Sequence, residues 1–460
     1  MDKRNSRKTS RTRLGDLVSL LREEILMGKR TAGEYLPSEK AFAEQYNLSN
    51  QSVRKGLDVL VSEGLIEKIP RVGTKVVGQP EGSFVTVKLG FHTSVTGEAD
   101  ILRLLSLFHK ENPHIRVQAV PLSGYSYSYI HNYLTGGILD VVMMNYTNFQ
   151  EFLEIDNGDL LEPTQRNPAT YPFLSDAFMA KDGRQLVQPF IFSPLILCYN
   201  RSHFQEANLP EPDSSWQWQD LIENAGKLAI PNERLGFHCD LYSPNRWPLL
   251  LLQAGAKFER NADGRIRLSG TPMMDALRYS KEMKHSIPYL SEGVTTGESE
   301  RLLAKGKVSM IMTSYFYLNY LLGEELPFDI APVPHLGTPL TLLLNTGLAV
   351  YRHSQVKDAA VKLVEFLTSY QSQLFIRQQT YSLPARKLAA EWVGEEQRYR
   401  PSRFSLFRET MPCFRYFTDL GINATELAEL NQELKLYWAG LENEETLSLQ
   451  IEERVADSAV

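Results

Sequence analysis

The sequence contains little cysteine and none of the short motifs that mark common enzyme classes. Its three cysteines, Cys198, Cys239 and Cys413, lie far apart and form no CxxC pair. This argues against a zinc site and a disulfide framework, and it fits a reducing cytoplasm. The nine histidines form no HExxH pattern, and there is no GxSxG elbow or Walker A loop. We therefore expect no enzymatic activity, no metal and no cofactor.

Long apolar segments are also missing. No run of apolar residues approaches the length that spans a membrane. Residues 1–13 form a basic tail, but no apolar stretch follows it as a secretory signal would require. We expect a cytoplasmic protein whose tail is either a solvated, disordered terminus or an arm that touches phosphate.

The charge of the chain is unevenly distributed. The 460 residues carry a net charge of -6, yet residues 1–78 hold 15 Lys and Arg against 10 Asp and Glu, a net charge of +5. A composition of 43% hydrophobic and 23% charged residues is that of a globular protein, and the length predicts two or three domains. A basic first domain on an acidic body indicates that only the first domain meets a polyanion.

A helix-turn-helix pattern fills much of that basic region. Ser49 is a favourable N-cap, and the residues behind it place an apolar stripe on one helix face. This stripe comprises Val53, Leu57, Leu60 and Val61. Gln51, Arg54 and Lys55 lie off the stripe near the helix start, where they can reach bases and phosphates in a major groove. The pattern is that of a recognition helix.

The flanking segments complete a winged helix over residues 14–77. Ser38 predicts the start of a short helix that runs to Tyr46, and Asn47–Leu48 supplies the turn. An earlier apolar stripe at Leu17, Val18, Leu21 and Ile25 predicts a supporting helix. Residues 65–69 and 74–77 alternate as two strands around a break at residues 70–73, which predicts a hairpin wing.

Residues 36–46, 49–60 and 63–66 with Gly73–Thr74 resemble the winged helix-turn-helix of GntR-type bacterial regulators. The resemblance implies operator DNA as a partner. The candidate DNA-binding residues are Lys40, Ser49, Asn50, Gln51, Ser52, Arg54, Lys55, Arg71, Gly73 and Thr74. Asn50 stands where the family commonly has Arg, and Arg71–Val72–Gly73 replaces a Gly-basic-Gly wing tip. The alternative is a winged helix that serves as a protein-interaction module.

A polar linker, residues 78–83, separates this domain from a body of different periodicity. From Phe84 onward, apolar strand-like runs alternate with amphipathic helical stretches. Extended segments are expected at 84–91, 115–120 and 139–144, and helices at 101–110 and 129–135. The alternation predicts an α/β fold with a largely parallel sheet.

Phrases in this body, in order over roughly residues 84–400, are similar to the extracellular solute-binding proteins of ABC importers, the maltose-binding class. They include FHKENPHIRV at 108–117 and GGILDVV at 136–142. The resemblance implies a type II, two-lobed periplasmic-binding-protein-like domain over residues 84–460. It also implies crossing segments near 188–192 and 313–316 and closure on a ligand. Helices within residues 424–455 pack on a lobe or form a dimer contact, since winged-helix regulators usually act as symmetric pairs.

Ligands of open α/β sheets lie beyond the carboxyl ends of strands. The segments that follow the expected strands there are rich in aromatic residues, which suit the faces and hydroxyl edges of a sugar. The candidate ligand-binding residues are His92, Tyr125, Tyr127, Asn145, Tyr146, Tyr242, Arg246, Trp247, Ser314, Tyr315, Asn345 and Tyr381. Each aromatic residue among them can instead be a core or lobe-interface residue. No cluster of charged residues is evident, so we expect a neutral ligand such as an oligosaccharide.

The sequence therefore predicts a ligand-sensing transcriptional regulator with operator DNA and a small-molecule effector, in particular a carbohydrate, as partners. Two alternatives remain. One is the solute-binding component of a carbohydrate importer, which would need an export signal or a lipidated Cys. The other is a regulator with an enzyme-derived body, as in family members with an aminotransferase-like body, which would need a cofactor-binding lysine pattern.

Overall fold

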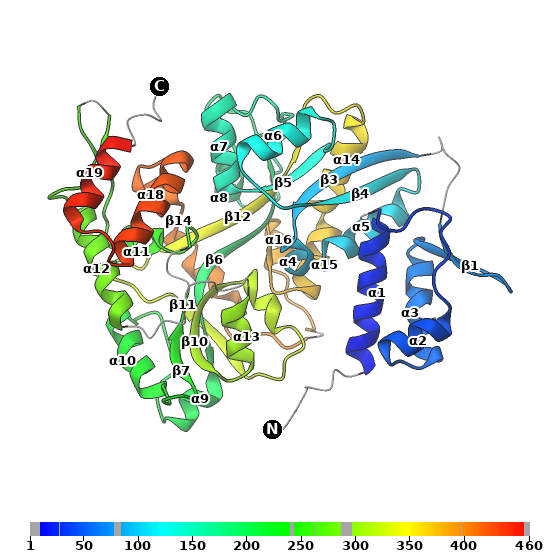
Figure 1. Ribbon diagram of the computed structural model, residues 1–460, viewed down its shortest axis with the longest axis horizontal. Coiled ribbons are helices and arrows are strands. Elements are labelled where there is room, and N and C mark those ends of the chain that lie inside the picture. Colours follow the sequence, from blue (N-terminus) through cyan, green and yellow to red (C-terminus); the bar gives the residue numbers. More distant parts are fainter. Residues whose placement is uncertain are drawn as a thin grey trace.

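The structure is a computed structural model. It describes residues 10–26, 28–77, 84–239, 243–262, 264–286, 297–396 and 398–454. The winged helix lies at one end of the long axis and the two C-terminal helices lie at the other, with two α/β lobes between them (Figure 1). The expected linker 78–83 lies outside the described residues, and so does most of the expected basic tail. The described part of that tail, Ser10–Arg13, is helical, because the first helix begins before residue 14.

The N-terminal domain has the expected three helices and hairpin. Its elements are α1 (Ser10–Leu26), α2 (Glu39–Tyr46), α3 (Asn50–Ser62), β1 (Ile66–Ile69) and β2 (Gly73–Val76). The side chains of Ser38 and Ser49 accept the backbone N–H groups of Ala41 and Ser52, which caps α2 and α3 as predicted. Asn47 ends α2 in the left-handed conformation, with φ 50°.

Close packing of α1 on α3 depends on Gly56. A Cβ at this position would lie 2.8 Å from Leu14 Cδ1 and 3.0 Å from Val18 Cγ2. Most of the apolar residues expected on both helices form the core here, since Leu17, Val53 and Leu60 are fully buried, but Val61 is 38% exposed and lies outside it. The recognition helix is therefore held on a rigid base.

The first lobe begins with alternating strands and helices. They are β3 (Val85–His92), α4 (Val95–Ala99), α5 (Ile101–Glu111), β4 (Ile115–Leu122), α6 (Tyr127–Thr135), β5 (Val141–Asn145), α7 (Tyr146–Asp156) and α8 (Pro172–Asp176). The chain returns to this lobe with α14 (Lys357–Leu367), α15 (Tyr370–Gln379), β13 (Leu383–Pro384) and α16 (Lys387–Ala390). Strand β3 pairs in parallel with both β4 and β5, as the alternation predicted.

The second lobe is built mainly from the middle and the end of the chain. Its first part comprises α9 (Arg201–Glu206), α10 (Trp218–Leu228), β7 (Leu235–His238), α11 (Pro248–Gln253), β8 (Glu259–Arg260), β9 (Ile266–Arg267), α12 (Pro272–Ser286), α13 (Glu298–Ala304), β10 (Val308–Ser314), η1 (Tyr317–Leu321) and β11 (Phe328–Pro332). The rest comprises η2 (Phe404–Leu406), α17 (Phe407–Thr410), η3 (Met411–Cys413), β14 (Phe414–Arg415), η4 (Phe417–Leu420), α18 (Ala424–Trp438) and α19 (Glu444–Arg454).

Two long strands join the lobes in one mixed sheet. Strand β6 (Gln188–Asn200) pairs antiparallel with β12 (Thr341–Val350) through its first half and with β10 through its second half. The expected first crossing at 188–192 lies in β6, but the second is not at 313–316. That segment ends β10, and the next strand, β11, pairs again with the second half of β6. The return is made by β12, whose later residues pair with β5. These crossing strands make the centre of the sheet antiparallel.

Candidate functional site: a cavity between the lobes and a DNA-facing helix

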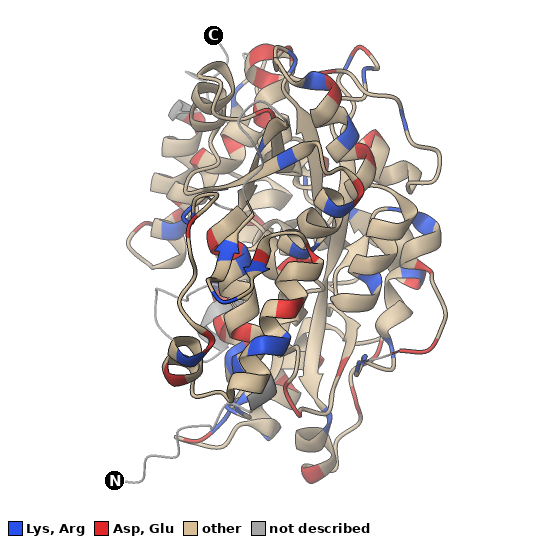
Figure 2. Ribbon diagram, turned by 90° about the vertical axis from the view of Figure 1, so that its right-hand side faces the viewer, with Lys and Arg blue, Asp and Glu red and all other residues tan. Residues whose placement is uncertain are grey.

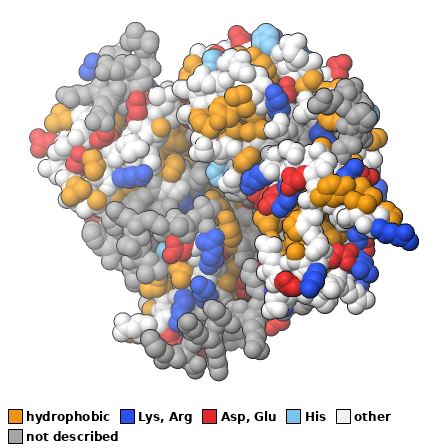
Figure 3. All heavy atoms as spheres, turned by 45° about the vertical axis from the view of Figure 1, so that its right-hand side comes forward, with side chains coloured by type: hydrophobic (Ala, Val, Ile, Leu, Met, Phe, Trp, Pro, Cys, Tyr) orange, Lys and Arg blue, Asp and Glu red, His pale blue; other side chains and the backbone are white. Residues whose placement is uncertain are grey.

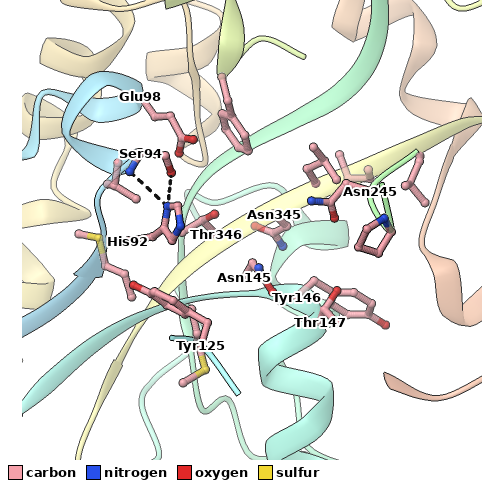
Figure 4. Close-up of a pocket in the computed structure, with 18 of the residues that line it drawn as sticks. His92, Ser94, Glu98, Tyr125, Asn145, Tyr146, Thr147, Asn245, Asn345 and Thr346 are labelled. Carbon is pink, nitrogen blue, oxygen red and sulfur yellow. Dashed lines mark hydrogen bonds between the residues drawn. The ribbon is translucent and has the colours of Figure 1, made fainter. Parts of the chain in front are cut away.

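A cavity of about 410 Å³ lies beside the crossing strands. The first lobe contributes residues that follow its strands: His92 after β3, Tyr125 after β4, and the turn from β5 into α7. The second lobe contributes Asn245 and Tyr317, and β12 runs along the cavity between them. Figure 4 shows these side chains converging from both lobes on one space. The carboxyl ends of parallel strands thus form one wall, as expected for an α/β sheet.

Glu98 is the acidic residue of the cavity lining. It lies on the short helix α4, is only 9% exposed and lines the cavity. Burial raises its pKa to about 7, although a hydrogen bond with Ser94 opposes the rise. His92 stays neutral more readily, because burial lowers its pKa, and its Nδ1 accepts the Ser94 N–H at 3.2 Å.

Two polar groups at the cavity lack a hydrogen-bond partner among the described residues. Asn345, on β12, is 1% exposed, and its Nδ2 donates to Tyr416 Oη at 3.3 Å while its Oδ1 is unpaired. The Tyr125 hydroxyl is buried and also unpaired. A buried polar group without a partner is costly, so both groups are prepared to bind a ligand or water.

Aromatic rings share the apolar part of the lining with Met143, Met144 and the leucines of β12, and Tyr416 lies just behind the lining. Tyr146 stacks on Tyr416 with centroids 4.0 Å apart, and its ring lies edge-on to Phe417 at 5.6 Å. Its hydroxyl is 3.0 Å from Thr418 Oγ1, which ties the start of α7 to η4. At the opposite end the rings of His92 and Tyr125 meet at 5.4 Å.

The structure brings together five of the twelve residues expected to bind the ligand. His92, Tyr125, Asn145, Tyr146 and Asn345 all line the cavity. Asn145 also caps α7, because its Oδ1 accepts the Asn148 N–H at 2.9 Å. Tyr242 lies outside the described residues.

Six expected wall residues must be corrected, because each is held in a core or beside the cavity instead. They are Tyr127, Arg246, Trp247, Ser314, Tyr315 and Tyr381. Tyr127 faces α7 through Asp156, Tyr315 donates to the Phe404 carbonyl and Tyr381 donates to the Tyr399 carbonyl. Trp247 is 2% exposed and packs on Trp438.

The other two corrected residues sit just behind the lining. Arg246 is buried with its guanidinium 5.9 Å from the Tyr317 ring, and Ser314 is fully buried at the end of β10.

Sequence reasoning missed several lining residues, above all Glu98, Thr147, Tyr317 and Phe417. Glu98 is a single charged residue rather than a cluster, and it lies outside the segments from which a neutral ligand was expected. Thr147 and Tyr317 follow strand ends that had been recognised, so a wider window after each strand would have included them. Glu98 follows β3 by six positions and reaches the cavity through the turn of α4, which has no local sequence signal.

The predicted DNA-binding residues lie together on the outer face of α2, α3 and the wing. Lys40, Asn50, Gln51 and Lys55 are exposed, whereas Ser49 caps α3. Arg54 is exposed but forms a bidentate hydrogen bond with Glu39, with Nη2–Oε2 at 2.8 Å. Figure 2 faces this end of the molecule and shows basic and acidic residues interspersed along the ribbon. Two of the candidate cations, Lys40 and Arg54, have acidic partners in Glu44 and Glu39.

The wing turns through residues 70–72, because Ile69 pairs with Gly73. Arg71 has φ 66° and Gly73 has φ 146°, so the turn contains a left-handed residue that is not glycine. Arg71 and Val72 are exposed, and the hairpin projects from the body with apolar and basic side chains (Figure 3). Thr74, like Ser52, is half-buried.

A charge cluster joins the winged helix to the first lobe. Arg22 on α1 donates two hydrogen bonds of 2.9 and 2.8 Å to Glu63, the C-cap residue of α3. Arg103 on α5 approaches the same carboxylate at 3.4 Å. Asp100, which precedes α5, is close enough for Arg22 and Arg103 to lower its pKa, although burial raises the pKa overall. We call Arg22, Glu63, Asp100 and Arg103 the junction cluster.

Within the described residues, no helix has the length and apolar character that a membrane crossing requires. The same residues contain no group of three His, Cys, Asp or Glu side chains arranged to hold a metal ion.

Comparison with known proteins gives two family matches. Residues 15–76 match the model of bacterial regulatory proteins of the gntR family, and residues 94–374 match that of bacterial extracellular solute-binding proteins. An uncharacterised HTH-type transcriptional regulator of Escherichia coli (strain K12), YieP, is 33% identical over 73 residues, 16% of this chain and 32% of that protein. Neither family is an enzyme family.

Relatives of the body include binding proteins. The putative binding protein BAB2_0491 of Brucella abortus (strain 2308) is 26% identical over 234 residues, 48% of this chain, and the alignment spans 54% of that protein, about half its length. The sn-glycerol-3-phosphate-binding periplasmic protein UgpB of Shigella dysenteriae is 23% identical, and the match covers 76% of this chain and 87% of that one.

Solved structures show the same fold. The substrate-binding protein Lmo0181 of Listeria monocytogenes, in complex with cycloalternan, has a TM-score of 0.67 at 18% identity and covers 82% of this chain and 99% of its own. Maltose-bound MalE3 of T. maritima also has a TM-score of 0.67, at 17% identity, with coverage of 80% and 98%. Since the solute-binding match spans more than half of its residues, the chain belongs to the family of bacterial extracellular solute-binding proteins, and a winged helix of the gntR family precedes that domain.

Proposed function

We propose that this chain is a ligand-responsive bacterial transcriptional regulator that acts in the cytoplasm. In this proposal the winged helix binds operator DNA through α3 and the wing. The two-lobed body binds a small molecule, a sugar or oligosaccharide, in the cavity between its lobes. Ligand binding then changes the affinity for DNA.

One observation carries the proposal: a single short segment lines the cavity and contacts the C-terminal end of the recognition helix. His92, Ser94 and Glu98 line the cavity. Two residues after Glu98, Asp100 begins the approach to the junction cluster, where Arg103 meets Glu63 at the end of the recognition helix. A ligand that moves α4 would therefore act directly on the support of α3.

The carbohydrate assignment rests on the shape and chemistry of the cavity. Stacked aromatic rings with polar edges and unpaired amide and hydroxyl groups suit a polyol. The solved relatives bound to cycloalternan and maltose support the same class, as does a Streptomyces glaucescens receptor solved with acarbose.

Ligand binding can shift DNA binding only by its differential affinity for the two states, typically about 1–3 kcal/mol. Two winged helices, called the heads, would bind two half-sites of the operator as a symmetric pair, which requires a second copy of the chain. An importer component remains the alternative, but it would leave the DNA-facing surface of the winged helix without a role.

The test begins with a thermal-shift screen of the full chain against mono- and oligosaccharides, with amino acids and phosphorylated sugars as controls. A ligand at 100 times its dissociation constant should stabilise the protein by about 2.7 kcal/mol. The chain then selects DNA fragments from a random pool, and affinity for them is measured with and without the hit. A stabilising sugar that leaves DNA affinity unchanged would contradict the regulatory role, and failure to select any DNA would contradict the operator-binding role.

A further inference from the structure

We infer that the ligand presents a protonated amine to Glu98, so that this residue selects an amine-bearing carbohydrate. The inference rests on the proposed function, because it names the ligand class of the same cavity. It departs from the neutral ligand expected from sequence, since that expectation overlooked the carboxyl group in the cavity lining.

The first argument is the absence of a counter-charge. Among the described residues that line the cavity there is no Lys or Arg. Arg246 lies behind the Tyr317 ring and donates to the Asn245 carbonyl, and the Glu98 carboxyl has Ser94 as its recorded hydrogen-bonding neighbour. A buried carboxyl group either keeps its proton or takes a partner of opposite charge, and here a cationic ligand can supply that charge.

The second argument is the kind of hydrogen bond that the cavity lacks. Asn345 Oδ1 accepts hydrogen bonds and is unpaired in a side chain that is 1% exposed. Figure 4 shows Glu98 and Asn345 both directed at the space between the lobes. An ammonium group offers three donors and no acceptor, so it suits the Glu98 carboxylate, while a hydroxyl group of the same sugar can donate to Asn345 Oδ1.

The third argument is the aromatic surround. Tyr125, Tyr317 and Phe316 line the cavity with Glu98. Burial is the main cause that raises the pKa of the Tyr125 and Tyr317 hydroxyls, and the nearby Glu98 carboxylate adds to the rise. Aromatic faces attract cations, and the attraction grows when the cation leaves water. An N-acetyl group would instead bring a carbonyl acceptor and extra bulk toward these acceptors.

The experiment compares three disaccharides that share one β-1,4-linked skeleton and differ at carbon 2. They are cellobiose with hydroxyl groups, diglucosamine with amines, and N,N′-diacetylchitobiose with acetamides. The corresponding monosaccharides extend the series, and spermidine tests an amine without a sugar. Affinities are measured calorimetrically on the full chain at neutral pH, for the wild type, Glu98→Gln, and the control Glu111→Gln. Glu111 is an exposed residue at the end of α5, outside the cavity lining.

Diglucosamine should bind more tightly than cellobiose and the acetylated sugar. Glu98→Gln keeps the size of the side chain but removes its charge. It should therefore lower the affinity for diglucosamine by about 10- to 100-fold and the affinity for cellobiose by less than about 3-fold. Glu111→Gln should bind all probes like the wild type. If the melting temperature of ligand-free Glu98→Gln equals or exceeds that of the wild type, the loss of ligand affinity is not caused by unfolding.

The other outcomes separate the two claims. Equal or tighter binding of cellobiose or the acetylated sugar would overturn the amine but keep the carbohydrate sensor. If spermidine binds and diglucosamine does not, the amine is supported and the carbohydrate ligand is overturned. If no probe binds up to about 10 mM, the amine-bearing sugar is overturned, whereas the carbohydrate ligand of the proposed function stands or falls with the thermal-shift screen.

Discussion

Replacing Glu63 by Leu should destabilise the winged helix and remove its ion pair with the first lobe. The Glu63 and Arg22 side chains are each only 6% exposed, and two hydrogen bonds join them. The leucine would leave the Arg22 guanidinium buried without its carboxylate. Removing one partner of a buried ion pair costs about 3–5 kcal/mol, so α1 and α3 should lose most of their mutual stabilisation.

The double variant Arg22→Met/Glu63→Leu separates stability from coupling. Replacing a buried ion pair by apolar side chains of similar volume is often neutral or stabilising. We therefore expect its stability to lie within about 1 kcal/mol of the wild type. It still lacks the carboxylate that Arg103 approaches at 3.4 Å. The double variant should bind DNA yet respond less to ligand.

Hydrogen exchange in α1 and α3 measures the local stability, because a two-domain chain need not unfold in one step. Operator affinity with and without ligand then measures the coupling. Arg103→Ala removes the contact to the first lobe with a smaller loss of stability. The Arg103 side chain is 40% exposed, and an ion pair of an exposed side chain contributes only about 0.2–1 kcal/mol. Lys110→Ala, at an exposed position on the same helix, is its control.

Unchanged hydrogen exchange in α3 of Glu63→Leu would refute the stabilising role of the Arg22–Glu63 pair. The coupling role would equally be refuted if the double variant kept the full effect of ligand on DNA affinity. In the second case the junction cluster would hold the domains together without carrying the response.

Three further predictions follow from single contacts. Arg54→Ala should weaken operator binding by roughly 10- to 100-fold in a gel-shift assay, whereas Glu39→Gln, which removes the carboxylate paired with Arg54, should strengthen binding to unrelated DNA; near-native operator binding by Arg54→Ala would remove α3 from the interface. Glu98 should contribute stability that is lost as pH rises from about 4.5 to about 7, because burial raises its pKa to about 7 and the folded state holds its proton; the difference in melting between the wild type and Glu98→Gln over this range measures that contribution. His109 should contribute with the opposite sign, because burial lowers its pKa to about 4 while its Nε2 accepts the Val117 N–H at 2.8 Å; its contribution should be lost as pH falls from about 6.5 to about 4, and the difference between the wild type and His109→Gln measures it in the same assay.

The elements that sequence reasoning predicted well are those set by local chemistry. The Ser49 cap, the left-handed Asn47 and the apolar stripe of α3 all depend on residues within one or two turns, and each is present except that Val61 is exposed. The parallel pairing of β3 with β4 and β5 also follows from their alternation with helices. Local patterns therefore located the winged helix and the first lobe.

The errors arise where distant segments decide the environment. Trp247 follows a turn that suggested a cavity loop, yet it packs on Trp438, nearly 200 residues later in the chain. Tyr315 lies at a strand end as expected, but its hydroxyl donates a hydrogen bond to the Phe404 carbonyl in the core. Glu98 is the opposite case, a residue that was not expected at the cavity. The turn of α4 places its charged side chain in the cavity lining. No local periodicity reports such packing.

The arrangement of the domains leaves two routes by which the ligand can act on DNA. The winged helix packs on the first lobe through α5 and β4, so the two would move together when the lobes close. Lobe closure would then change the spacing of two heads only if the copies meet through the second lobe, for example through α18 and α19 at the far end of the molecule (Figure 1). The other route runs through α4 and the junction cluster and needs no such contact. Because Arg103→Ala interrupts only the second route, a response that survives this variant points to a change in head spacing, and a response that disappears points to the recognition helix itself.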